Sequence, residues 1–368
     1  MSASGFHALK RSVVFLFIAA IALFIACSPS RLNAQTSSSL EPGPKPHDIP
    51  KMWRPWIGEY GWPPESGESG PVFVVSEDGG SILIRERDSH SPDTKYKEVE
   101  SFSVSVSPAD TVHTHLDISR LGVRAFHIGD VSYRKMTPDT NATQQVLIKP
   151  VKPITKLRAE ALADSPPHED GPFRKPELVE LTSLDPVIHF DIRYATTNDF
   201  LGTPVYTQAR AFMQRPAAEA LVRALHKVQP LGYGLLLHDA YRPWYVTKIF
   251  WDATPPEGKI FVADPSQGSR HNRGCAVDLT LYDLATGKPI EMPGTYDEMS
   301  PRSFPDYPGG TSLQRWHRDL LRRAMESEGF TVYEHEWWHF DYKDWREYPI
   351  LNIKFEDLHS GQGLASAN

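Results

Sequence analysis

A histidine and an aspartate, His271 and Asp278, lie seven residues apart in the stretch SRHNRGCAVDLTLYD, residues 269–283. Both residue types bind divalent metal ions, and Gly274 between them allows the chain to turn so that both side chains reach one point. A catalytic zinc ion usually takes three protein ligands and keeps a fourth position open for water. The stretch therefore supplies two of the ligands that such a site needs.

The third ligand is expected far along the chain, in the segment EHEWWHFDY, residues 334–342. It contains Glu336 and His339. Because hydrolysis also needs a base, we assign His271, Asp278 and His339 to zinc, and we assign Glu336 to proton transfer from water to the leaving amine. Residues three apart on a regular strand point to opposite faces, so a bulge or a strand end must bring Glu336 and His339 together.

The same segment offers a competing interpretation, because residues 335–339 match the zincin motif H-E-x-x-H. That motif works only on a helix, where histidines four residues apart share a face. The surrounding residues are mostly aromatic or β-branched, which favours a strand over a helix. We therefore expect a strand here, with His335 outside the metal site.

An arginine, Arg242, follows the apolar run GYGLLLHDA and precedes PWYVTKIFWDA. Its planar guanidinium could stabilise a developing oxyanion or bind a substrate carboxylate. The alternative is a structural arginine that pairs with Asp239. The segment by itself leaves both interpretations open.

The composition bounds the protein class. The chain has 368 residues, of which 40% are hydrophobic and 23% are charged, as in soluble globular proteins. This length suffices for two domains. A net charge of −7 argues against nucleic acid as a partner. The two cysteines, Cys27 and Cys275, are too few for a Cys₄ zinc site.

The N-terminus has the pattern of an export signal. Lys10 and Arg11 precede the apolar run 13–26, which is short for a membrane span and ends at Cys27. Small residues before this cysteine indicate a bacterial lipoprotein signal, whereas cleavage after Ala34 would release a soluble protein. Both alternatives predict export, and the first predicts a periplasmic protein with a lipid anchor through Cys27.

The pattern of apolar and polar residues predicts two folded parts. Short alternating runs joined by turns indicate strands in the first part, and interspersed helices and strands indicate an α+β fold in the second. The predicted organisation is an export signal at 1–27, a linker at 28–50, a small all-β accessory domain at 51–136, a linker at 137–176 and a catalytic domain at 177–358.

Five motifs in this second part resemble those of the VanX-type zinc D-alanyl-D-alanine dipeptidases. They are YATTNDF, GYGLLLHDAYRP, SRHNRGCAVDLTLYDLATG, GTYDEM and EWWHF. The resemblance covers roughly residues 180–350. It implies the fold shared with the D-Ala-D-Ala carboxypeptidases and Hedgehog-like proteins, with a central antiparallel sheet flanked by helices.

The resemblance also implies roles for single residues. Zinc would be bound by His271, Asp278 and His339, Glu336 would act as general base and acid, and Arg242 would stabilise the transition state. Residues matching substrate-pocket positions are Tyr194, Ser269 and Asp297. Of these, Asp297 would hold the ammonium group of the dipeptide. Cys275 stands where a serine is common, and its place near the metal ligands suggests sensitivity to oxidation.

The activity implied is hydrolysis of D-alanyl-D-alanine to two D-alanines. In an exported enzyme this activity would serve the recovery of dipeptides from the cell wall. Two alternatives remain: a D,D-carboxypeptidase or endopeptidase that acts on peptidoglycan stem peptides, and a zinc-stabilised binding module without activity. The presence of both Glu336 and Arg242 favours an enzyme.

Overall fold

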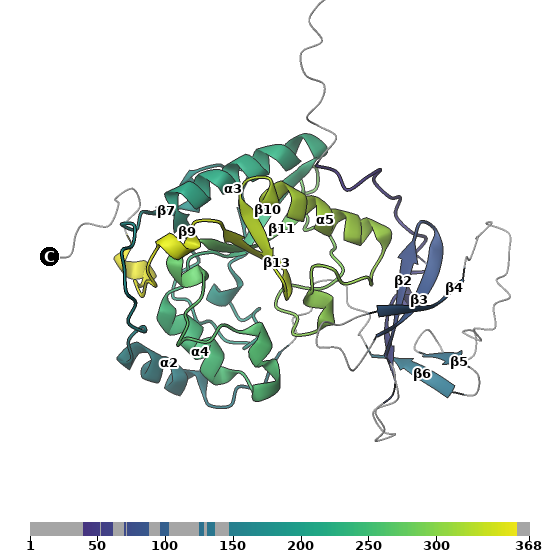
Figure 1. The fold of residues 1–368 in the computed structure, drawn as a ribbon, viewed down its shortest axis with the longest axis horizontal. Coiled ribbons are helices and arrows are strands. Elements are labelled where there is room, and N and C mark those ends of the chain that lie inside the picture. Colours follow the sequence, from purple (N-terminus) through teal and green to yellow (C-terminus); the bar gives the residue numbers. More distant parts are fainter. Residues whose placement is uncertain are drawn as a thin grey trace, which may run out of the picture. The chain divides into compact units, whose positions relative to one another are not determined.

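The structure is a computed structural model, and it describes residues 40–51, 53–61, 70, 72–87, 96–102, 125–128, 131–136 and 147–358. Its strands and helices together make an α+β protein (Figure 1). The predicted export signal, including Cys27, lies outside the described residues. Within them, no helix combines the length and the apolar character that crossing a membrane requires.

The first part of the chain forms a six-stranded sheet, which we call the N-terminal sheet. Its strands are arranged in the order β4-β3-β2-β1-β6-β5, and each pairs antiparallel with its neighbour. A two-residue turn at Gly79 and Gly80, both with positive φ, joins β2 to β3, as the Gly-Gly pair predicts. The strands are β1 (Gly58–Gly61), β2 (Val72–Asp78), β3 (Ser81–Arg87), β4 (Tyr96–Phe102), β5 (Ala125–Ile128) and β6 (Val131–Lys135).

The second part, residues 147–358, is built on a five-stranded sheet in the order β12-β13-β11-β10-β8. Every residue of β10 is buried, and all but the last residue of β11 are buried, so both faces of the sheet centre are covered. The strands are β8 (His189–Phe190), β10 (Tyr233–Asp239), β11 (Ala276–Asp283), β12 (Phe330–Tyr333) and β13 (Glu336–Tyr342), with β7 (Leu178–Glu180) and β9 (Phe212–Gln214) in a separate pair.

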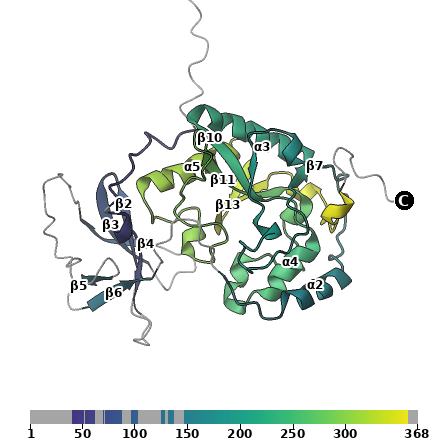
Figure 2. The same ribbon diagram turned by 180° about the vertical axis from the view of Figure 1, so that it is seen from behind.

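Helices cover this sheet on two sides. Figures 1 and 2 place α3 (Arg215–Val228) and α5 (Ser312–Glu326) on one side, and α2 (Ile154–Ala163) with α4 (Trp244–Ala253) on the other. α3 has a proline in its first turn, where the missing N–H costs little, and it buries an apolar stripe. α5 begins with a capping box, in which the Thr311 hydroxyl accepts from Gln314 N and the Gln314 side chain accepts from Thr311 N.

Two features differ from the sequence-based expectation. The five-stranded sheet is mixed, because β8 pairs parallel with β10 while the other pairs are antiparallel. The stretch 137–176 is expected to be a loose connector with room for one short helix. Its helix α2 is not loose, because it packs against α4 and buries Leu157 and Ala161 completely. Apolar burial by α2 therefore adds to the core of the second part.

The described residues from Glu41 onward belong to one compact unit, in which Glu77 of β2 contacts the start of α5. Oε2 of Glu77 accepts hydrogen bonds from the backbone N and the hydroxyl of Ser312, at 2.8 and 2.7 Å. Oε1 of Glu77 accepts from Gly80 N at 2.8 Å. A carboxylate at a helix N-terminus satisfies free N–H groups and the helix dipole.

Candidate metal centre and active site

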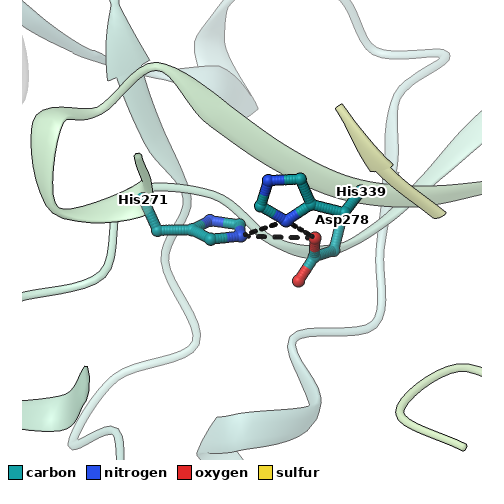
Figure 3. A group of neighbouring side chains, drawn as sticks. All are labelled: His271, Asp278 and His339. Atoms are coloured by element: carbon teal, nitrogen blue, oxygen red, sulfur yellow. Dashed lines mark hydrogen bonds and ion pairs between the residues drawn. The ribbon is translucent and has the colours of Figure 1, made fainter. Parts of the chain in front are cut away.

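Three side chains from the two predicted segments meet at one point. His271 lies in a 3₁₀ turn (His271–Arg273) before β11, Asp278 lies on β11, and His339 lies on β13, directly opposite Asp278 in the strand register. His271 Nε2 is 3.0 Å from His339 Nδ1 and 3.3 Å from Asp278 Oδ1, and the last two atoms are 3.1 Å apart (Figure 3). All three side chains are buried.

The outer nitrogens of both imidazoles are bound to acceptors. His271 Nδ1 donates to the carbonyl oxygen of Ala240 at 2.6 Å, and His339 Nε2 donates to Asp341 Oδ1 at 2.9 Å. A carbonyl oxygen and a carboxylate cannot donate, so these contacts place the protons on the outer nitrogens. The inner nitrogens then present lone pairs toward Asp278, which is the arrangement that metal-binding histidines use.

The cluster has the properties of a cation site. Asp278 Oδ1 is buried and has no hydrogen-bond partner within the described part of the chain. The separations of 3.0–3.3 Å match the spacing of ligands around a tetrahedral ion with bonds of about 2 Å. Although burial alone would lower it, the carboxylates of Asp341 and Asp278 raise the pKa of His339 to about 10. A positive charge at the inner nitrogen, from a proton or from a metal ion in its place, is therefore favoured here, and two nitrogens with one carboxylate suit zinc.

The second oxygen of Asp278 is held by a residue that sequence reasoning missed. The hydroxyl of Tyr296 donates to Asp278 Oδ2 at 3.1 Å, and the ring of His238 stacks on Tyr296 with centroids 4.5 Å apart. Tyr296 is eighteen residues from Asp278, and no local pattern marks this pairing. With Oδ2 bound to Tyr296, Oδ1 is the oxygen left for an ion.

Glu336 stands at the start of β13, and a bulge brings it to the same side as His339. Tyr333 pairs with Glu336 while Val332 pairs with Phe340, so residues 337–339 are extra residues on β13. Glu336 Oε2 lies 3.6 Å from His339 Nδ1. Burial, which outweighs the favourable charge of His339, raises the pKa of Glu336 to about 7.

The zincin interpretation is wrong, because residues 335–339 form a turn and a strand instead of a helix. His335 packs against Phe304 with the two rings tilted and their centroids 5.4 Å apart, and its Nδ1 is 3.3 Å from the hydroxyl of Tyr333. It takes no part in the cluster of His271, Asp278 and His339.

Arg242 forms the ion pair of the structural alternative and also lies beside the metal cluster. Its Nε and Nη2 donate to Asp239 Oδ2 at 2.9 and 2.7 Å, as the structural alternative predicts. Its Nη2 is also 3.7 Å from Asp278 Oδ2, beside the metal cluster. The rings of Tyr194 and Phe250 lie 5.3 and 4.9 Å from the guanidinium carbon. The cation is therefore fixed in a buried position, with Asp239 as its anchor.

The three residues that match substrate-pocket positions also lie at this site. Tyr194 donates to Asp297 Oδ1 at 3.1 Å, whereas Asp297 Oδ2 is buried and has no partner among the described residues. Asp297 has a φ of 56°, which costs a non-glycine residue free energy and often marks a functional site. Ser269 precedes the turn that carries His271, and its hydroxyl accepts from His271 N at 3.2 Å.

One cavity, with a volume of about 470 Å³, is lined by the three residues of the metal cluster and by Glu336, Arg242, Tyr194, Ser269 and Asp297. Its outer wall includes the 3₁₀ segment Pro256–Phe261, with Ile260 exposed. Burial raises the pKa of Asp297, and the nearby charge of Asp278 adds to this effect. A ligand with an ammonium group would therefore relieve an unfavourable burial of charge at Asp297.

The position of Cys275 argues against the expected sensitivity to oxidation. Its side chain is completely buried, and it does not line the cavity. Burial raises the pKa of the thiol, so the reactive thiolate is disfavoured. The thiol is a small packing residue at the start of β11.

Comparison with known proteins gives a consistent result. A family model described as D-ala-D-ala dipeptidase, of peptidase family M15, matches residues 174–358. A D-alanyl-D-alanine dipeptidase of Escherichia coli is 35% identical over 179 residues, which cover 49% of this chain and 91% of that protein. Dipeptidases of the same name from Enterococcus faecalis and Enterococcus faecium are 36% and 35% identical, over 47% and 48% of this chain and 95% and 98% of theirs.

Proposed function

The chain belongs to the D-Ala-D-Ala dipeptidase family of metallopeptidases, and from this premise we propose that it hydrolyses D-alanyl-D-alanine to two D-alanines with a zinc ion held by His271, Asp278 and His339. The observation that carries the proposal is the convergence of these three donor atoms beside Glu336 and Arg242, in a cavity that also contains Asp297. Family membership indicates the substrate, and the side chains of the site indicate the mechanism.

A zinc ion bound there would act as a Lewis acid, which polarises the peptide carbonyl and lowers the pKa of water. The protein holds the ligand set rigid for this purpose. Ala240 O and Asp341 fix the two imidazole rings, and Tyr296 fixes the carboxylate of Asp278. Preorganised ligands of this kind raise metal affinity by avoiding reorganisation on binding.

Glu336 serves as the base and then as the acid. Its carboxylate takes a proton from the water that attacks the peptide carbonyl carbon, and it passes this proton to the leaving amine nitrogen. A pKa near neutrality suits both transfers, and burial raises the pKa of Glu336 toward that range. The bulge at residues 337–339 keeps its oxygens beside the metal ligands.

Arg242 stabilises the negative charge that develops on the carbonyl oxygen. The side chain is 8% exposed and is held by Asp239 and two aromatic rings, so its charge is in place before the reaction begins. A preorganised cation in a site that excludes water is worth more than the same cation in solvent. Asp297, supported by Tyr194, binds the ammonium group of the dipeptide.

Substitution of the base tests this proposal. We expect Glu336→Ala to retain its metal and to lose D-alanine release by a factor on the order of 10² or more. Glu334→Ala removes an exposed acid two residues earlier and should keep full activity. Metal content and the rate of D-alanine release are measured on all three proteins. Unchanged hydrolysis by Glu336→Ala would remove Glu336 from the mechanism.

A second candidate is a D,D-carboxypeptidase that acts on peptidoglycan stem peptides. The cavity of about 470 Å³ is larger than two alanine residues require, so a longer peptide has room in it. Rates on the free dipeptide and on a stem pentapeptide distinguish the two activities. A binding module without activity would show neither rate while still binding zinc.

We also propose that the enzyme acts after export, as the N-terminal pattern of residues 1–27 suggests. Hydrolysis outside the cytoplasm fits the recovery of dipeptides released from the cell wall. Fractionation of cells that express the full chain tests this location. A full-length cytoplasmic pool with an uncleaved N-terminus would contradict it.

A further inference from the structure

Arg270 is a cation on the cavity wall whose hydrogen-bonding capacity is largely unused. It precedes His271, and its guanidinium carbon lies 5.5 Å from the ring of Tyr333 and 5.1 Å from that of Trp345. Its Nε is 3.5 Å from Asp341 Oδ2, which is long for a hydrogen bond, and has no hydrogen-bond partner among the described residues. The side chain is 38% exposed. Two aromatic rings therefore hold the guanidinium of Arg270, whose N–H groups can still donate hydrogen bonds.

The other long cations of the cavity wall are already bound. Arg242 gives two donors to Asp239. Lys259 donates to the carbonyl oxygen of Trp251 and lies over the ring of the same residue. Among the arginines and lysines that line the cavity in the described part of the chain, Arg270 is thus the one free to form a new ion pair.

Arg270 and Asp297 are connected, through intermediate residues, to different members of the metal cluster. Asp297 is bound by Tyr194, whose ring contacts Arg242, and Arg242 in turn faces Asp278. Arg270 instead lies by Asp341, the partner of His339. The cavity therefore contains both an acid and a base, and each is connected to a different ligand of the metal cluster. A short peptide with both of its ends free has the complementary charges.

We propose that Arg270 binds the free C-terminal carboxylate of the substrate, with the hydroxyl of Ser269 as a second donor. This inference rests on the proposed dipeptidase function. A guanidinium fork forms two parallel hydrogen bonds to a carboxylate, which a lysine or an amide cannot reproduce. With the ammonium group on Asp297 and the carboxylate on Arg270, the site accepts a peptide of two residues and excludes a blocked or extended C-terminus.

The test compares D-Ala-D-Ala with its C-terminal amide. We expect wild type to prefer the acid. Arg270→Gln should raise KM for the acid roughly 10- to 100-fold, the range for a lost hydrogen bond between charged groups. Its kcat should fall far less, hydrolysis of the amide should change little, and Arg270→Lys should recover part of the loss. The control is Arg346→Gln, which removes an exposed arginine stacked 4.1 Å from the centre of the Trp345 ring and outside the cavity wall.

Metal content and direct binding keep this test separate from that of the proposed function. If Arg270→Gln loses zinc, or slows acid and amide hydrolysis equally, Arg270 supports Asp341 and does not select the carboxylate. If wild type hydrolyses neither compound, the dipeptidase proposal fails, and calorimetry of acid and amide binding still tests Arg270. Equal affinity of wild type and Arg270→Gln for the acid would then overturn the inference.

Discussion

The N-terminal sheet and the five-stranded sheet each bury a carboxylate, and the two are used differently. Glu77 on β2 and Asp278 on β11 are both 2% exposed. Both oxygens of Glu77 accept hydrogen bonds, from Gly80 and Ser312. Asp278 has one oxygen bound to Tyr296 and one that accepts no hydrogen bond from the described residues. Burial therefore does not distinguish a structural acid from a functional one, whereas an acceptor that faces two imidazole nitrogens does.

The largest effect should follow from removing the charge of the functional acid. We expect Asp278→Asn to lose its metal and to reduce D-alanine release by a factor on the order of 10³, because an amide is a poor ligand for zinc. Asp283→Asn, at the other end of β11, should retain both properties. Metal content after dialysis and the release rate are the measurements. Full metal binding by Asp278→Asn would show that the carboxylate of Asp278 is not a metal ligand and that it does not differ from Glu77 in this respect.

A buried base extends the comparison, because His317 on α5 is kept neutral by its surroundings. Lys45 donates to the Tyr233 hydroxyl at 2.6 Å, and this hydroxyl lies 2.9 Å from His317 Nε2. Burial, aided by the charge of Lys45, lowers the pKa of His317 to about 4. In the unfolded chain this histidine has a pKa near 6.5, so the unfolded chain binds more protons than the folded chain between pH 4 and pH 6.5. The stability that depends on neutral His317 is therefore complete above pH 6.5 and is lost as the pH falls below it.

From pH 7 to pH 5, this loss should amount to roughly 2 kcal/mol of unfolding free energy. Denaturant unfolding of wild type and of His317→Gln at both pH values measures it, because the difference between the two proteins isolates this histidine. A variant that loses as much stability as wild type would show that other groups cause the acid sensitivity.

The hydroxyl of Tyr296 should have a moderate effect on the metal. We expect Tyr296→Phe to weaken metal binding by about tenfold, since partners that orient a ligand contribute at this level. The assay is competition with a chelator. Tyr282→Phe is the matched control, because its hydroxyl donates to Val187 O at 2.7 Å, away from the metal ligands. Equal affinity of both variants would mean that Asp278 needs no support.

The smallest effect is expected for the structural acid. Glu77→Ala should lower the unfolding free energy by about 1–2 kcal/mol, because the start of α5 loses its acceptors. Its kcat should equal that of wild type, and Glu86→Ala on the neighbouring strand β3 serves as control. Denaturant unfolding and D-alanine release are both measured. A fall in kcat without a fall in stability would give Glu77 a role in the reaction.

The sequence predicted those parts of the fold that depend on local patterns. Within the predicted α+β part, α3 and α5 follow from helical periodicity and, for α3, from proline placement, whereas β10 and β11 follow from runs of apolar and β-branched residues. The segment 331–342, expected as one strand, forms the hairpin of β12 and β13. No local pattern could place the bulge, since it depends on which residues of β12 pair with β13.

The site was predictable where side chains of metal-binding type recur at short spacing. His271, Asp278 and His339 meet, as their types and positions suggested. Asp341 and Tyr296 were missed because each acts on a metal ligand, and the sequence does not show which side chains contact that ligand in the fold. Their signal is a contact in three dimensions, which a single sequence does not contain.

The bulge on β13 also fixes how this segment can change during evolution. Side chains along a strand alternate in direction, and each residue advances the chain by about 3.3 Å. Inserting or deleting one residue between Glu336 and His339 would turn one of them away from the ion, even if every other side chain were preserved. The segment should therefore tolerate many substitutions and almost no change in length.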